Sequence, residues 1–274
     1  MIQKKTKFNR EKDLELLNNQ KMKLRITSIQ NFLVFLKRLK SVEKSVILEL
    51  TKDELFCKVH TADKSVMKYT SVSLSDVLEG DVDWAKLKTD RIKIGILDAT
   101  RLMEAFKHFR PEEDVYLELT TDTVDGECVS TEMKLTSASL NIRLRCADLG
   151  LLSYVEDSIL SMVHSQEDAN AQFKIYQSDF TTILSLCGLE TNSEEVLAFE
   201  IDAKSAHASG DSFRYKLNLG ASEITTNGSV VSNIYKNQLS YMEAETCQVY
   251  VHDNRLVMCS EQSSTSIAIG LVEK

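Results

Sequence analysis

Few side chains in this sequence are spaced for acid–base chemistry. His207 lies near Asp202 and Asp211, and His252 is followed directly by Asp253. A histidine beside a carboxylate can act as a general base, but catalysis also requires a positioned nucleophile or substrate group. Neither histidine is accompanied by a nucleophile motif. The sequence therefore predicts no catalytic residue, and an enzyme is the least favoured interpretation.

The six cysteines and five histidines also lack the spacing of a metal site. The cysteines form no Cys-x-x-Cys pair, and no histidine lies at ligand spacing from them. The nine glycines form none of the phosphate-binding loops of nucleotide enzymes. We therefore expect no metal, no cofactor, and cysteines that remain reduced thiols in the core.

Charge and length limit the possible functions further. The chain has 274 residues and a formal net charge of −8, which argues against nonspecific coating of nucleic acid but allows a local basic surface. No apolar run approaches the roughly 20 residues that span a bilayer. We expect a protein without membrane association that works in the cytoplasm, that of the host cell if the source is viral.

Elements that could position functional side chains follow a repeated order. Thr27 and Ser28 precede a helical pattern that runs to about residue 40, and three strand-like stretches follow it. The order restarts at residue 91, where Asp98 is the expected helix cap, and again at residue 173, where Ser178 or Asp179 is expected to cap. A fainter fourth unit spans residues 230–271.

The second and third units align at an offset of 81 residues, so that Lys93 matches Lys174 and Leu102 matches Ile183. Such repetition predicts an α+β fold of two similar domains, each with antiparallel sheets and two helices. We expect an N-terminal charged extension (1–21), a first domain (22–150), a connector (151–170) and a second domain (171–274).

The expected helices carry cations opposite their apolar stripes. Placed at 100° per residue, the exposed faces hold few acidic residues although the chain as a whole is acidic. Such a face attracts phosphates without reading bases. The predicted DNA-facing residues are Lys37, Arg38, Lys40, Lys44, Arg101, Lys107, His108 and Lys236.

Repeated strand–helix–meander units with basic helix faces resemble the DNA sliding clamp family, which includes proliferating cell nuclear antigen and bacteriophage clamps. The resemblance is nearest to clamps of the T-even type. The stretches concerned are Ser75–Leu78, Ile94–Leu97 and Phe213–Gly220.

The resemblance implies a ring, formed as a head-to-tail homotrimer with the helices around duplex DNA. It also implies a DNA polymerase that the clamp tethers as a processivity factor, and a clamp loader ATPase that opens the ring. Partner peptides are expected in a pocket near the connector, formed by Leu151, Leu152, Tyr154, Ile267, Ile269 and Leu271.

Two alternatives to a ring remain open. The same duplicated fold could serve as a monomeric or dimeric DNA-binding processivity factor, which would bind linear DNA without a loader. A structural β-rich viral protein is the other alternative, and its helix-face cations would have no salt-dependent effect on DNA association.

Overall fold

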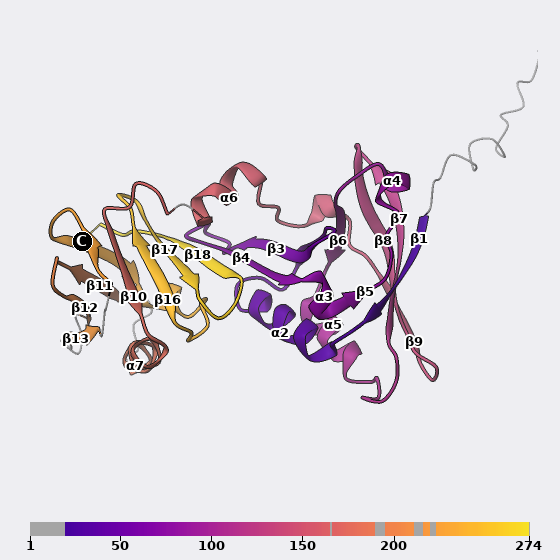
Figure 1. The fold of residues 1–274 in the computed structure, drawn as a ribbon, viewed down its shortest axis with the longest axis horizontal. Coiled ribbons are helices and arrows are strands. Elements are labelled where there is room, and N and C mark those ends of the chain that lie inside the picture. Colours follow the sequence, from indigo (N-terminus) through magenta and orange to yellow (C-terminus); the bar gives the residue numbers. More distant parts are fainter. Residues whose placement is uncertain (1–19, 165, 190–194, 211–215, 220–222, 274) are drawn as a thin grey trace, which may run out of the picture.

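The computed structural model describes residues 20–164, 166–189, 195–210, 216–219 and 223–273. Within these residues a strand–helix–three-strand unit occurs four times (Figure 1). The first unit contains β1 (Gln20–Ile26), α2 (Ile29–Lys40), β2 (Val46–Leu50), β3 (Glu54–His60) and β4 (Val66–Ser73). The second contains β6 (Ile92–Ile96), α5 (Ala99–Phe106), β7 (Tyr116–Val124), β8 (Glu127–Thr136) and β9 (Asn141–Arg145).

The second half of the chain repeats this order. Its first unit contains β10 (Ala171–Ile175), α7 (Gln177–Gly188), β11 (Val196–Ile201), β12 (Ala206–Gly210) and β13 (Lys216–Leu219). Its second contains β15 (Val230–Tyr235), α8 (Lys236–Leu239), β16 (Cys247–Val251), β17 (Arg255–Ser260) and β18 (Thr265–Gly270). Short elements between the units are α3 (Leu74–Val77), β5 (Leu78–Glu79), α4 (Trp84–Leu87), η1 (Leu149–Leu151), α6 (Asp157–His164) and β14 (Thr225–Thr226).

Side-chain caps set the start of the two helices in the first half. Ser28 accepts a hydrogen bond from the backbone N–H of Asn31, and Asp98 accepts from those of Thr100 and Arg101. These bonds satisfy backbone donors that have no partner inside a helix. The expected cap of α7 was wrong, because that helix begins at Gln177 after an extended Tyr176 that makes no side-chain cap.

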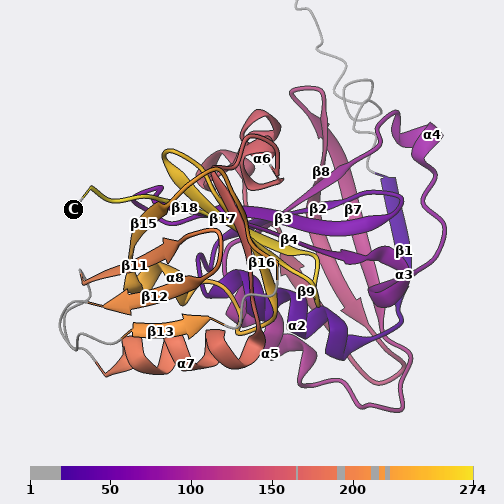
Figure 2. The ribbon, with the colours of Figure 1, turned by 60° about the vertical axis from the view of Figure 1, so that its left-hand side comes forward.

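One continuous sheet joins the two halves of the chain. Among the described residues it has 14 strands, and β4 pairs with β18 in antiparallel register from Thr70↔Thr265 to Val66↔Ile269. A separate sheet has the order β13-β12-β11-β15. Figure 2 shows this second sheet beside α7 and α8, at the end of the molecule far from β1 and α4.

Two large apolar clusters fill the molecule. The first lies within residues 22–146 and includes Phe32 and Phe106, whose ring centroids are 5.1 Å apart. The second gathers Phe173 and Phe199 with strands of the second half. These separate cores support the predicted division into two domains, and the exact boundaries stay a prediction.

The connector contains a helix, α6, that the sequence pattern did not predict. Figure 1 shows it on the opposite side of β3 and β4 from α2. Strand β12 and the short elements of the segment around Trp84 were also not predicted. No helix among the described residues is long and apolar enough to cross a membrane.

Candidate nucleic-acid interface

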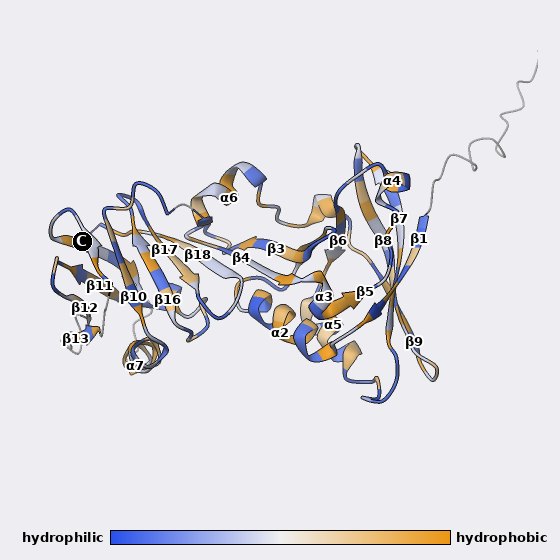
Figure 3. Ribbon diagram, in the orientation of Figure 1, coloured by the Kyte–Doolittle hydropathy of each residue, from blue (hydrophilic) through white to orange (hydrophobic). Residues whose placement is uncertain are grey.

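Helices α2, α5 and α7 lie along one side of the molecule (Figure 1). The colouring of Figure 3 marks both hydrophobic and hydrophilic positions along α2. Phe32 and Leu36 are buried against the sheet, whereas Asn31 and Ser41 are exposed. The amphipathic pattern therefore turns one face of the helix away from the core, as its sequence predicted.

Most of the predicted cations are exposed, either in α2 and α5 or in the segments that directly follow these helices. Lys37, Lys40 and Lys44 are exposed, as is His108. The side chain of Arg101 is 84% exposed and lies 3.7 Å from Asp98, the residue that caps its own helix. An ion pair with so exposed a guanidinium contributes little to stability, and the guanidinium can still contact a phosphate.

Lys107 is also exposed, but its amine lies 2.6 Å from the carboxylate of Glu104 one turn earlier. Both side chains are more than half exposed, so solvent screens the pair strongly. Thr182 and Ser185 of α7 are exposed as well, and each donates its hydroxyl hydrogen bond back to its own helix. The one charged residue of α7 is the partly exposed Asp179, so this helix lacks the cations of α2 and α5.

Arg38 forms a largely buried ion pair, whereas Lys37 and Lys40 of the same helix are exposed. Its guanidinium lies 3.2 Å from a carboxylate oxygen of Glu245, and the two side chains are only 19% and 15% exposed. Ser260 and Ser263 donate hydrogen bonds to the same carboxylate at 2.5 and 2.6 Å. Burial opposes ionisation of Glu245, but the two serines and Arg38 outweigh it and hold its pKa below the ordinary value.

Lys236 does not face solvent, which corrects its predicted DNA-facing role. It is 7% exposed, and its amine donates to the backbone carbonyl of Cys187 at 3.2 Å. Glu195 lies 3.9 Å away. The amine therefore binds the start of α8 to the end of α7, whereas Asn237 of α8 and its C-cap Ser240 are exposed.

Strand β9 supplies two further cations that helix patterns could not find. Arg143 and Arg145 are exposed, and with Lys44 and Arg101 they border a surface groove of about 570 Å³. Leu97, which is 63% exposed, also lines it. The alternation of Arg143 and Arg145 along a strand was the available sequence signal.

The predicted partner pocket is only partly on the surface. Leu151 and Tyr154 are exposed, Leu271 is partly buried and Leu152 is buried. Ile267 and Ile269 are fully buried in the second core, so they cannot line a surface pocket. Because side chains alternate along a strand, Ala268 of β18 instead faces the connector helix.

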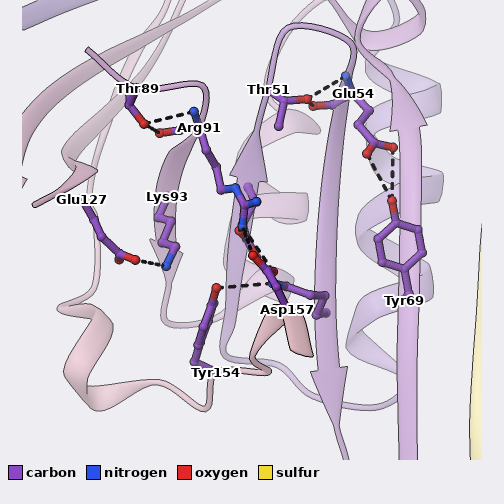
Figure 4. Close-up of polar contacts among 11 residues, drawn as sticks. Thr51, Glu54, Tyr69, Thr89, Arg91, Lys93, Glu127, Tyr154 and Asp157 are labelled. Atoms are coloured by element: carbon purple, nitrogen blue, oxygen red, sulfur yellow. Dashed lines mark hydrogen bonds and ion pairs between the residues drawn. The ribbon is translucent and has the colours of Figure 1, made fainter. Parts of the chain in front are cut away.

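The connector is attached to the first half by a cluster of charged groups (Figure 4). Asp157 accepts from Lys58 at 2.5 Å and from Arg91 at 3.0 Å. Beneath it, Glu49 lies 2.9 Å from Lys58 and 2.8 Å from Arg91. The hydrogen bond from Lys58, with that from Arg91, holds the pKa of Asp157 below its usual value.

Tyr154 completes this attachment. Its ring lies 4.2 Å from the Lys93 amine and 4.7 Å from that of Lys58, measured to the ring centroid. Cations at this distance from an aromatic face are attracted by its quadrupole. Lys93 is also bound by Glu127 at 2.6 Å, as Figure 4 shows.

Solved structures with this arrangement are clamps. Proliferating cellular nuclear antigen of Entamoeba histolytica aligns with a TM-score of 0.67 at 12% identity, over 92% of this chain and 98% of that one. The chain has the DNA-clamp fold. The PCNA2–PCNA3 complex from Sulfolobus tokodaii gives a TM-score of 0.64 at 14% identity, over 91% and 99% of the two chains.

A third clamp structure contains a bound partner. It is that of the C-terminal region of FEN-1 bound to A. fulgidus PCNA, with a TM-score of 0.65 at 12% identity over 92% of this chain and 99% of the other. No protein-family model matches the sequence, and no curated protein matches it significantly. At these identities the likeness shows the clamp fold alone.

Within the clamp fold, two of the carboxylates first considered for acid–base chemistry accept hydrogen bonds that hold local structure. Asp202 accepts backbone hydrogen bonds from Lys204 and Ser205, and Asp253 accepts from the Asn170 amide. His252 is buried. Asp211, like half of the stretch Phe213–Gly220 used for the resemblance, lies outside the described residues.

Proposed function

We propose that this protein is a sliding clamp that encircles duplex DNA and tethers a DNA polymerase to it. The observation that carries the proposal is the basic solvent face of α2 and α5 on a clamp fold whose net charge is −8. Such a face attracts the phosphate backbone without sequence preference, and the attraction weakens steeply with salt. A protein that must move along DNA requires contacts of this kind.

The two ends of the molecule support assembly into a homotrimeric ring. Among the described residues, β9 pairs only with β8, and β13 pairs only with β12. The two strands lie at opposite ends in Figure 1, so a β9 edge of one copy can pair with a β13 edge of the next. Such head-to-tail contacts close a ring when the rotation between copies allows it.

The groove beside β9 fits this head-to-tail arrangement. Leu97 and Leu144 give it an apolar lining, and Arg143 and Arg145 stand at its border. An exposed leucine beside an unpaired strand edge is a feature of protein interfaces. A neighbouring copy that pairs with β9 would cover both, and a clamp loader ATPase would have to open this contact.

The proposed role requires no bond-making step. Encirclement supplies the lasting association with DNA, while Lys37, Lys40, Lys44, Arg101 and Lys107 provide a screened attraction that orients the duplex. Tethering of other proteins is suggested by the FEN-1 segment bound to A. fulgidus PCNA. We infer that a polymerase is held in a comparable way near the connector.

Charge reversal on the helices tests DNA contact. We expect the double variant Lys37→Glu, Arg101→Glu to weaken binding to a short duplex and to reduce the slope of log affinity against log salt by about 2. Fluorescence anisotropy over a salt series measures both quantities. Lys204→Glu, in the exposed β11–β12 turn, is the control away from the helices and makes half of the double variant's charge change. Identical slopes in all three proteins would exclude this face as the contact surface and favour the structural-protein alternative.

A further inference from the structure

The connector helix α6 covers an apolar surface that crosses the junction of the two halves. Val163 is fully buried against Tyr250, Val257 and Ala268, which belong to β16, β17 and β18. Met67 of β4 packs at the border of the same cluster. This cluster is separate from the two domain cores and lies on the opposite side of the sheet from the DNA-facing helices (Figure 1).

Few contacts hold α6 on this surface. Val163 is the one residue of the helix that is buried, Ile159 and Leu160 are partly buried, and Met162 is 39% exposed. His164 adds an edge-on ring contact to Tyr69 at 4.7 Å. A helix of eight residues is marginal by itself in water. Its folding therefore depends on the surface beneath it.

The first turn of α6 is held by charge. Lys58 and Glu49, which lie 2.9 Å apart beneath the connector, are each about 1% exposed. With Arg91 the group carries two positive charges and one negative charge, and Asp157 supplies the balancing carboxylate. The Asp157 side chain is 55% exposed. Without it, a net positive site would remain at the end of an uncovered apolar surface.

We propose that α6 is a displaceable occupant of a docking surface for partner peptides. The partner that fits is a short helical segment with a carboxylate for Lys58 and Arg91 and an apolar side chain six residues later, as in Asp157 and Val163. The inference rests on the proposed clamp function, because a clamp must offer a surface to the protein it tethers. A partner peptide from another chain can then bind only when α6 has left the surface. This requirement lowers the apparent affinity of any partner.

Hydrogen exchange in the full-length wild-type protein tests whether α6 can leave. The amides of Leu160–His164 should exchange at least about a hundredfold faster than those of β4 and β18, because α6 opens while the sheet stays folded. Asp157→Asn should accelerate α6 exchange about tenfold without changing the sheet. Glu156→Gln, which removes the same charge from the neighbouring residue, should change neither. Exchange of α6 at the rate of the sheet in all three proteins would overturn the proposal.

A synthetic peptide of residues 153–164 tests the docking surface itself. Labelled and titrated with full-length protein, it should bind Asp157→Asn at least about fivefold more tightly than wild type, because the competing α6 is weakened. The same peptide with Asp157→Asn and Val163→Ser should lose binding to both. Equal affinity for the two proteins, or no binding to either, would show that α6 is a fixed part of the fold. Both readouts are independent of ring assembly and DNA binding, so they fail or succeed separately from the clamp function.

Discussion

The Arg38 guanidinium and the Glu245 carboxylate form an ion pair 3.2 Å long that connects helix α2 of the first half to the segment before β16 in the second. Its neighbour is the Lys68 amine, which donates to Glu243 at 3.0 Å and to the carbonyl of Tyr241 at 2.7 Å. The junction between the halves is therefore made by β4–β18 pairing together with charged contacts beside it.

Removing Arg38 should destabilise the protein more than removing an ordinary surface cation. Arg38→Ala leaves the Glu245 carboxylate largely buried without its charged partner, so we expect a loss of about 1–3 kcal/mol in unfolding free energy. Denaturant unfolding measures it. Lys37→Ala, one residue earlier and exposed, should stay within about 0.5 kcal/mol of wild type. Equal effects of the two substitutions would contradict a structural role for the ion pair.

The same carboxylate should make stability depend on acid pH. The pKa of Glu245 is lowered in the folded protein, so its contribution is present above the ordinary glutamate pKa of about 4.5 and is lost as pH falls through the lower folded value. The stability difference between wild type and Glu245→Gln should therefore be constant from pH 6 to neutrality and shrink below about pH 4.5. Thermal unfolding over this range tests it, and a difference that grows with acid would refute the assignment.

Lys236 should matter for stability and not for DNA. Lys236→Ala removes the amine that binds the Cys187 carbonyl beside Glu195, and we expect a loss of about 1–3 kcal/mol. Duplex affinity should remain that of wild type, since the amine is buried. Asn237→Ala, at the next and exposed position, controls for helix propensity. A selective loss of DNA affinity in Lys236→Ala would restore the role predicted from sequence.

Gly95 should not tolerate a side chain. A Cβ atom at this position would lie 2.3 Å from the carbonyl oxygen of Ala147, whose own N–H donates to Gly95 at 2.9 Å. Gly95→Ala must therefore shift β6 or the segment around Ala147, at a cost of about 1–3 kcal/mol. Gly188→Ala meets open space at the end of α7 and should be neutral or slightly stabilising. If the two variants had the same unfolding curve, the close approach of Gly95 to Ala147 would be contradicted.

Sequence patterns predicted the elements best where several signals agreed. Ser28 and Asp98 are cap residues placed before helical periodicity, and both helices begin there. The offset of 81 residues also holds in space, because Lys93 and Lys174 lie in β6 and β10, and Leu102 and Ile183 lie in α5 and α7. Repetition was informative because each unit must bury the same kind of face.

Side-chain direction was harder to predict, for physical reasons that differ by element. Helix α8 has four residues, so a helical wheel did not describe the surroundings of Lys236. Strand β18 is buried on both faces, so alternation could not tell which of Ile267 and Ala268 faces the connector. The charged cluster of Glu49, Lys58, Arg91 and Asp157 joins residues up to 108 positions apart (157 − 49) and depends on tertiary structure.

The solution mass of the full-length protein tests the central claim most directly. Multi-angle light scattering over a concentration series should give about three times the chain mass of 31.0 kDa, because the proposed ring is a homotrimer. A Leu97→Glu, Leu144→Glu variant should shift the mass toward a single chain. A wild-type mass that stays near 31.0 kDa at all concentrations would contradict the ring and favour a monomeric processivity factor.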